Sequence, residues 1–70
     1  MSIVQINNTV VITERNRYGR DEDKVFVFDN DRIAEKVASA CKDEVKEVGE
    51  INLPLLRHQL KKAKIGFTQQ

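Results

Sequence analysis

The sequence contains few of the residues that build familiar chemical sites. It has one cysteine, one histidine, three glycines and no tryptophan. Cys41 cannot form a disulfide within the chain, and one Cys with one His cannot supply the four ligands of a structural zinc site. The glycines stand far apart, so no glycine-rich loop is available to hold a phosphate group. We therefore expect neither a metal nor a cofactor.

Long hydrophobic runs are absent as well. No segment approaches the roughly 20 apolar residues that a membrane-spanning helix needs. The N-terminal MSIVQINN has neither the basic region nor the apolar region of a secretory signal. A lone cysteine is typical of proteins from a reducing compartment. We expect a cytoplasmic protein with no integral membrane association.

The chain as a whole also lacks a strong charge of either sign, because 12 basic residues face 11 acidic ones. This balance excludes both an acidic DNA mimic and a strongly basic nucleoid protein. The 70 residues are enough for one small domain, residues 1–70. A domain of this size buries only about 60% of its unfolded surface, so good local packing or self-association is needed.

Three runs rich in β-branched or aromatic residues predict an antiparallel meander. SIVQI and TVVITER are separated by Asn7-Asn8, which favours a tight type I′ turn because asparagine tolerates a positive φ. An exposed connection follows over residues 15–23. KVFVF, residues 24–28, then predicts a third strand antiparallel to residues 9–14.

A helix is predicted after these strands. Apolar residues recur at spacings of three to four from Ile33 to Val48, while charged residues lie outside this arc. Asn30 and its acidic neighbours are candidate N-caps, and Gly49 is a natural terminator.

A second helix is expected from Asn52 to about Ile65, with Pro54 in its first turn and Gly66 closing it. Its leucines form a buried stripe, which Phe67 could extend. The predicted fold is therefore α+β: a three-stranded antiparallel meander followed by two helices.

Both faces of the predicted sheet are apolar. In KVFVF, Val25 and Val27 point one way while Phe26 and Phe28 point the other. Strands that are apolar on both sides are usually covered on both sides. We expect a homodimer in which a second copy covers the face that the helices leave open; the alternative places the two helices on opposite faces.

Cys41 and His58 are the only conventional nucleophile and base. Cys41 falls in the middle of the first helix's apolar stripe, where a cysteine acts as a small hydrophobe. His58 lies beside Arg57 and near Lys61 and Lys62, and these cations do not orient the imidazole as a base. No residue supplies a third, orienting group. We expect no catalytic residues and no enzymatic activity.

One basic cluster lies in the predicted connection between the second and third strands. It consists of Arg15, Arg17 and Arg20 with the aromatic Tyr18. Three guanidinium groups and a ring can grip phosphates or stack on a base. The same segment carries as many acids as bases, so the alternative is a solvated loop with local ion pairs.

A second basic cluster lies on the second helix, where no acidic residue follows Glu50. Its members are Arg57, His58, Lys61, Lys62 and Lys64. Such a face can contact phosphates, an acidic protein groove or an anionic membrane. The alternative is that the cations near the C-terminal end only complement the helix dipole.

The passage KVFVFDNDRIAEKVASA, with three strands leading into a helix, resembles the sheet-reading DNA-binding domains of the integrase-arm type at the level of the fold. That resemblance implies DNA binding through the sheet. The strands here carry aliphatic residues where a groove-reading sheet presents arginines and polar groups.

The sequence thus favours a small regulatory protein that docks on a larger acidic protein through the basic helix and the arginine-rich loop. Leu55 and Ile65, which fall outside the main apolar stripe, are the candidate anchors. The alternative is a nucleic-acid-binding regulator that uses the same cations.

Overall fold

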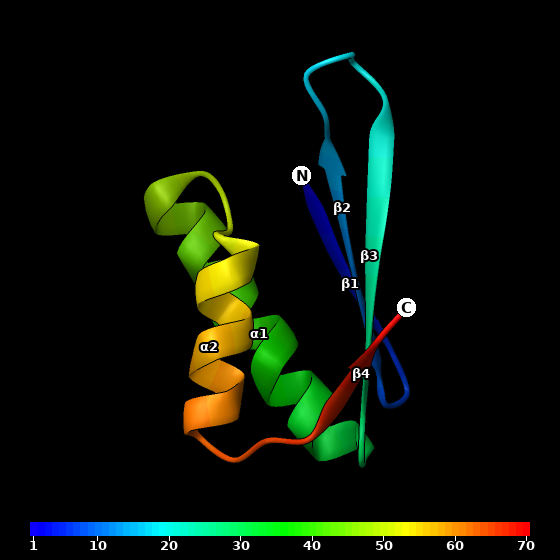
Figure 1. Ribbon diagram of the computed structural model, residues 1–70, viewed down its shortest axis with the longest axis vertical. Coiled ribbons are helices and arrows are strands. Elements are labelled where there is room, and N and C mark those ends of the chain that lie inside the picture. Colours follow the sequence, from blue (N-terminus) through cyan, green and yellow to red (C-terminus); the bar gives the residue numbers. More distant parts are fainter.

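The computed structural model describes all 70 residues and contains one four-stranded sheet and two helices (Figure 1). The elements are β1 (Ser2–Ile6), β2 (Thr9–Arg15), β3 (Asp21–Phe28), α1 (Asp31–Val48), α2 (Leu53–Lys62) and β4 (Phe67–Gln69). All neighbouring strands are antiparallel, in the order β1-β2-β3-β4. The predicted α+β class is confirmed, but the sheet has four strands rather than three.

The turn between β1 and β2 has the predicted two residues, with Ile6 opposite Thr9. Its type differs from the prediction. Asn7 has a φ of 54°, whereas Asn8 keeps a negative φ, and a type I′ turn requires positive values at both positions. The Asn8 side chain instead donates a hydrogen bond of 2.9 Å to the carbonyl of Phe28, which ties the turn to the end of β3.

β3 begins three residues earlier than predicted, so the connection from β2 shrinks to residues 16–20. Acidic residues have low strand propensity, yet here they pair across to β2. Thr13 donates a 2.8 Å hydrogen bond to the carboxylate of Asp23, and Glu14 lies opposite Glu22. Pairing with the neighbouring strand has overridden the local preference.

The C-terminal segment was predicted wrongly. α2 ends at Lys62, before Ile65, and the chain turns at Lys64, which has a φ of 60°. Gly66 is therefore not the terminator. Phe67 belongs to β4 and not to the helical stripe, and its ring centroid lies 5.7 Å from that of Phe26.

The predicted caps of the first helix are confirmed. The Asn30 side chain accepts a hydrogen bond from the backbone N–H of Ile33 at the start of α1, and Gly49 ends the helix with a φ of 91°. Asn52 caps α2 in the same way, by accepting from Leu55. The polar caps satisfy N–H groups that have no partner within the helix.

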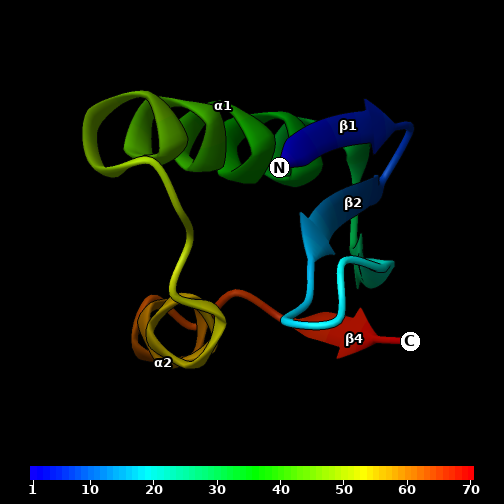
Figure 2. The same ribbon diagram turned by 90° about the horizontal axis from the view of Figure 1, so that it is seen from above.

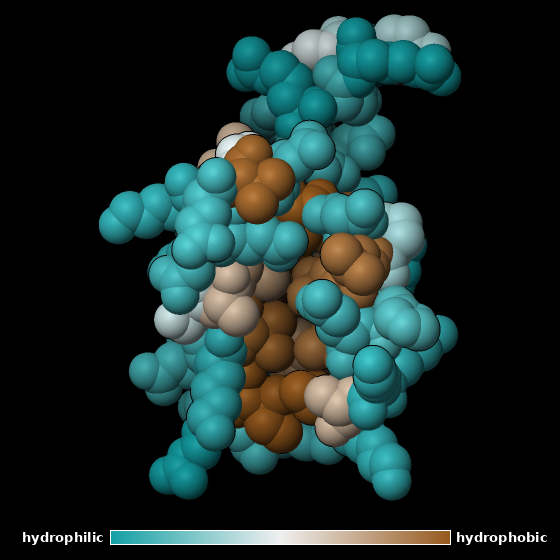
Figure 3. Space-filling view, turned by 90° about the vertical axis from the view of Figure 1, so that its left-hand side faces the viewer, coloured by the Kyte–Doolittle hydropathy of each residue, from teal (hydrophilic) through white to brown (hydrophobic).

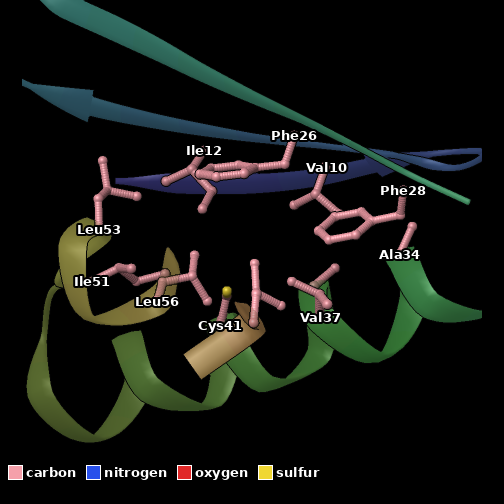
Figure 4. Close-up of a cluster of buried hydrophobic side chains, with 12 residues drawn as sticks. Val10, Ile12, Phe26, Phe28, Ala34, Val37, Cys41, Ile51, Leu53 and Leu56 are labelled. Atoms are coloured by element: carbon pink, nitrogen blue, oxygen red, sulfur yellow. The ribbon is translucent and has the colours of Figure 1, made fainter. Parts of the chain in front are cut away.

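Both helices lie on the same face of the sheet, so the alternative with one helix on each face is wrong (Figures 1 and 2). The inner side chains of the sheet point toward the helices and form a single buried cluster with them (Figure 4). Its members are Val10, Ile12, Phe26, Phe28, Ala34, Val37, Ala38, Cys41, Ile51, Leu53, Leu56 and Leu60.

The two helices differ in how closely they pack on the sheet. α1 packs directly on β1, β2 and β3. No Cα atom of α2 lies within 8 Å of a Cα atom of α1 or of any strand, so α2 reaches the core only through its long leucine side chains. Figure 2 shows α1 level with β1 and α2 level with β4. The helices therefore stand apart over the middle of the sheet.

Candidate interaction surface

α2 presents an apolar stripe to the core and cations to solvent. Leu53, Leu56 and Leu60 are buried, as expected from their spacing along the helix. The cations of the predicted site occupy the remaining circumference and its C-terminal end. The first turn of α2 contains no acidic residue, whereas its last turn contains Lys61 and Lys62.

The cations of α2 fall on two sides of the helix. Arg57 and Lys61, four residues apart, face β4, since the Arg57 guanidinium donates a 3.1 Å hydrogen bond to the side-chain carbonyl of Gln69. His58 and Lys62 form a second pair with the same spacing, on the outer side. Lys64 follows the helix, in the turn that leads to β4.

None of these α2 cations forms an ion pair. The two ion pairs of the molecule join Arg15 to Asp21 at 3.6 Å and Lys24 to Glu22 at 3.8 Å, both within the β2–β3 hairpin. The positive charge of α2 is therefore not neutralised by a neighbouring carboxylate, and a surface of this kind attracts anionic partners.

An apolar groove runs between α1 and α2. Its volume is about 260 Å³, and Figure 3 shows apolar atoms reaching the surface between the helices. Its lining residues are Lys36, Val37, Ala40, Leu56, Gln59, Leu60, Ala63 and Ile65. The groove exists because the helices stand further apart than the usual 8–10 Å between packed helix axes.

One cation, Lys36 of α1, lines this groove. Lys62 of α2 is not part of the lining and lies one helical turn from the lining residue Gln59, on the outer side of the helix. Leu55, one of the predicted anchors, is 44% exposed, and the other anchor, Ile65, lines the groove itself. The groove therefore combines apolar lining residues with one cation, Lys36, on its α1 wall, and Lys62 lies beyond its α2 wall.

The other basic cluster, Arg15, Arg17 and Arg20 with Tyr18, lies in the β2–β3 hairpin and is called the hairpin cluster below. Its environment differs from that of α2. Asn16, which the sequence reasoning missed, organises the loop: its side-chain carbonyl accepts hydrogen bonds from the backbone N–H groups of Tyr18 and Arg20. The Arg17 guanidinium lies 5.3 Å from the centroid of the Tyr18 ring, and that residue is 76% exposed. An asparagine ahead of a short turn is a recognisable signal for such a loop.

The structure does not bring the two basic clusters together. The β2–β3 loop lies at one end of the long axis of the molecule, whereas the C-terminal end of α2 lies toward the other end (Figure 1). The molecule extends 33 Å along this axis. A compact partner contacts one cluster or the other.

Cys41 and His58 do not form a catalytic pair. The Cys41 side chain is buried in the core, and that burial, with a smaller contribution from the charge of Glu44, raises the pKa of the thiol from 9.0 to about 11. His58 is exposed on the outer side of α2. A protonated, buried thiol is a poor nucleophile.

Comparison with known proteins gives no relative from which a function can be transferred. No family model matches the chain, no curated protein matches it, and no solved structure matches it. Neither helix is both long enough and apolar enough to cross a membrane. A functional assignment therefore depends on the geometry of the molecule itself.

Proposed function

We propose that the protein is a small, non-enzymatic regulatory protein of the cytoplasm that binds an acidic segment of a larger protein through α2 and the groove beside it. The observation that supports this proposal is the unpaired positive charge of α2 next to an apolar groove. The hairpin cluster lies at the other end of the molecule (Figure 1), and its Arg15 is paired with Asp21, so we do not include this cluster in the surface.

The segment that fits this groove is an amphipathic helix. Apolar residues at helical spacing enter the groove, which has small side chains, Ala40 and Ala63, on its two walls. Acidic residues on the flanks of that segment lie near Lys36 and Lys62. The remaining cations of α2 increase the rate of encounter, because they attract acidic partners over about 8–10 Å at physiological salt.

A synthetic peptide that carries the expected chemistry of the partner tests this proposal. The probe is a helical peptide of about 15 residues with leucine along one side and glutamate on both flanks. A control peptide has glutamine in place of glutamate. Fluorescence anisotropy of the labelled peptides measures the affinity. We expect the acidic peptide to bind more tightly than the glutamine peptide. The ratio of the two affinities should fall as salt is added, because salt screens the charges.

Three variants that each remove two positive charges locate the binding surface. Lys36→Ala/Lys62→Ala alters the groove, Arg57→Ala/Lys61→Ala alters the side facing β4, and Arg17→Ala/Arg20→Ala alters the hairpin. We expect about a tenfold loss of affinity for the groove variant, a smaller loss for the β4-side variant and no change for the hairpin variant. Equal losses in all three would show that net charge alone governs binding and would contradict the proposal.

Nucleic-acid binding is the second candidate, and the hairpin loop is the feature that favours it. The exposed Tyr18 ring with the Arg17 guanidinium beside it is suited to stacking on an unpaired base. A single-stranded oligonucleotide titrated at about 50 mM and about 200 mM salt tests this function. Binding that weakens steeply with salt and is lost in Tyr18→Ala would support it over peptide docking.

A further inference from the structure

The outer face of the sheet, which points away from both helices, is largely apolar in the half next to the β1–β2 turn. One cross-strand row on this face consists of Val4, Val11 and Val25. The next row consists of Ile6, Thr9, Val27 and Thr68. No other part of the chain lies over these rows (Figure 1). We refer to the two rows together as the outer apolar face.

The exposure of this face is unusual for a sheet with solvent on one side. Val4 is 47% exposed and Ile6 is 60% exposed. An antiparallel sheet that faces water normally alternates apolar and polar residues, so that polar residues point outward. Contiguous exposed aliphatic residues mark an interaction surface more often than a free one.

Charge on this side of the sheet is confined to one end. Arg15, Asp21 and Asp23 point outward near the loop of the β2–β3 hairpin, beyond the two apolar rows. The outer apolar face itself contains no charged residue. An acidic protein or a nucleic acid would find no free cation there, because Arg15 is paired with Asp21. The occupant of this face must itself be flat, aliphatic and uncharged.

We propose that this occupant is a second copy of the chain, packed face to face with its strands running in the opposite direction. In this orientation each apolar row meets the apolar rows of the other copy, and the charged hairpin ends point to opposite ends of the dimer. The parallel orientation would place the charged hairpin ends of both copies at the same end of the dimer, with the Asp23 residues close together. A two-fold interface needs a self-complementary surface of this kind.

The area of the face sets the expected strength of the dimer. From the lengths of the four strands and their usual spacing and rise, the whole outer side of the sheet projects roughly 350–400 Å², and the two apolar rows cover about half of it. A standard protein interface buries about 800 Å² on each partner. The outer apolar face is therefore much smaller than a standard interface, and we expect a weak, exchanging dimer that is populated only at high protein concentration.

Sedimentation equilibrium from about 10 µM to about 500 µM measures this association. Two lysine substitutions at sites of similar exposure separate the two sides of the molecule. Val4→Lys lies on the outer apolar face, and Leu55→Lys lies on the helical side. We expect the wild type and Leu55→Lys to form dimers, and Val4→Lys to be at least tenfold weaker, about the effect of losing 1.4 kcal/mol.

Two results would overturn the dimer. One is a wild type that stays monomeric over the whole concentration range. The other is an association that Val4→Lys leaves unchanged or that Leu55→Lys abolishes, since the helical side of the molecule would then be the interface. Circular dichroism checks that both variants fold, and Ile6→Lys repeats the test at an independent site. Because Lys36→Ala/Lys62→Ala should weaken peptide docking and leave the dimer unchanged, failure of the dimer and failure of the proposed function are distinguishable.

Discussion

The Asn30 side chain holds the start of α1 through one hydrogen bond, 2.9 Å from its carbonyl oxygen to the backbone nitrogen of Ile33. Replacing this residue with alanine leaves that N–H without its partner. We expect Asn30→Ala to lower the free energy of unfolding by about 1 kcal/mol in urea denaturation. Asn30→Asp keeps a capping oxygen and serves as the control. Equal stability of Asn30→Ala and the wild type would show that the cap contributes nothing.

The buried thiol of Cys41 predicts a dependence of stability on pH. In the unfolded chain the thiol ionises near its ordinary pKa of 9.0, whereas in the folded chain it stays protonated up to about 11. Between these values the unfolded state binds fewer protons, so rising pH favours unfolding. We expect the wild type to lose roughly 2 kcal/mol more than Cys41→Ala between about pH 8 and about pH 11. Urea denaturation at several pH values gives the two slopes, and parallel slopes would contradict the assignment.

The end of α1 depends on a backbone conformation that glycine adopts easily. Gly49 has a φ of 91°, whereas Gly66 has no positive φ and a Cβ added there would lie 3.7 Å from the Asp29 carboxylate, an ordinary contact. We expect Gly49→Ala to cost about 1 kcal/mol of stability. Gly66→Ala should stay within about 0.5 kcal/mol of the wild type. Thermal denaturation of the two variants compares them, and equal midpoints would refute the role given to Gly49.

The elements that the sequence predicts well are those that local chemistry determines. α1 has a cap, an apolar arc and a terminator within one segment, and all three are in place. β4 has only three residues and no periodicity of its own, and it forms because Phe67 and Thr68 find partners on β3. The early start of β3 has the same cause. The local sequence pattern does not determine which distant segments pair as strands.

The arrangement of whole elements decides which predicted site residues act together. The sequence places cations on the loop and on the second helix, but only the three-dimensional structure shows that the two clusters lie far apart. The groove depends on the spacing between α1 and α2, which the sequence does not show. For this reason Lys36, Ala40 and Gln59 were not among the predicted site residues. The apolar outer face, in contrast, follows from strand alternation alone.

Self-association should also be visible in thermal stability. Unfolding of a dimer is linked to its dissociation, so the midpoint of unfolding rises with protein concentration. We expect a rise for the wild type over a range from about 10 µM to about 500 µM and little change for Ile6→Lys. Differential scanning calorimetry measures both. A midpoint that is independent of concentration in the wild type would argue against the dimer.

The proposed function depends on binding of an acidic amphipathic helix by α2 and the adjacent groove. Amide chemical shifts of the ¹⁵N-labelled protein, followed during titration with the acidic peptide, report which residues the peptide contacts. We expect the largest changes on residues of both groove walls, Lys36, Ala40, Gln59 and Ala63, and much smaller changes with the glutamine peptide. Changes centred on the β2–β3 loop, or no localised change at about 1 mM peptide, would contradict it.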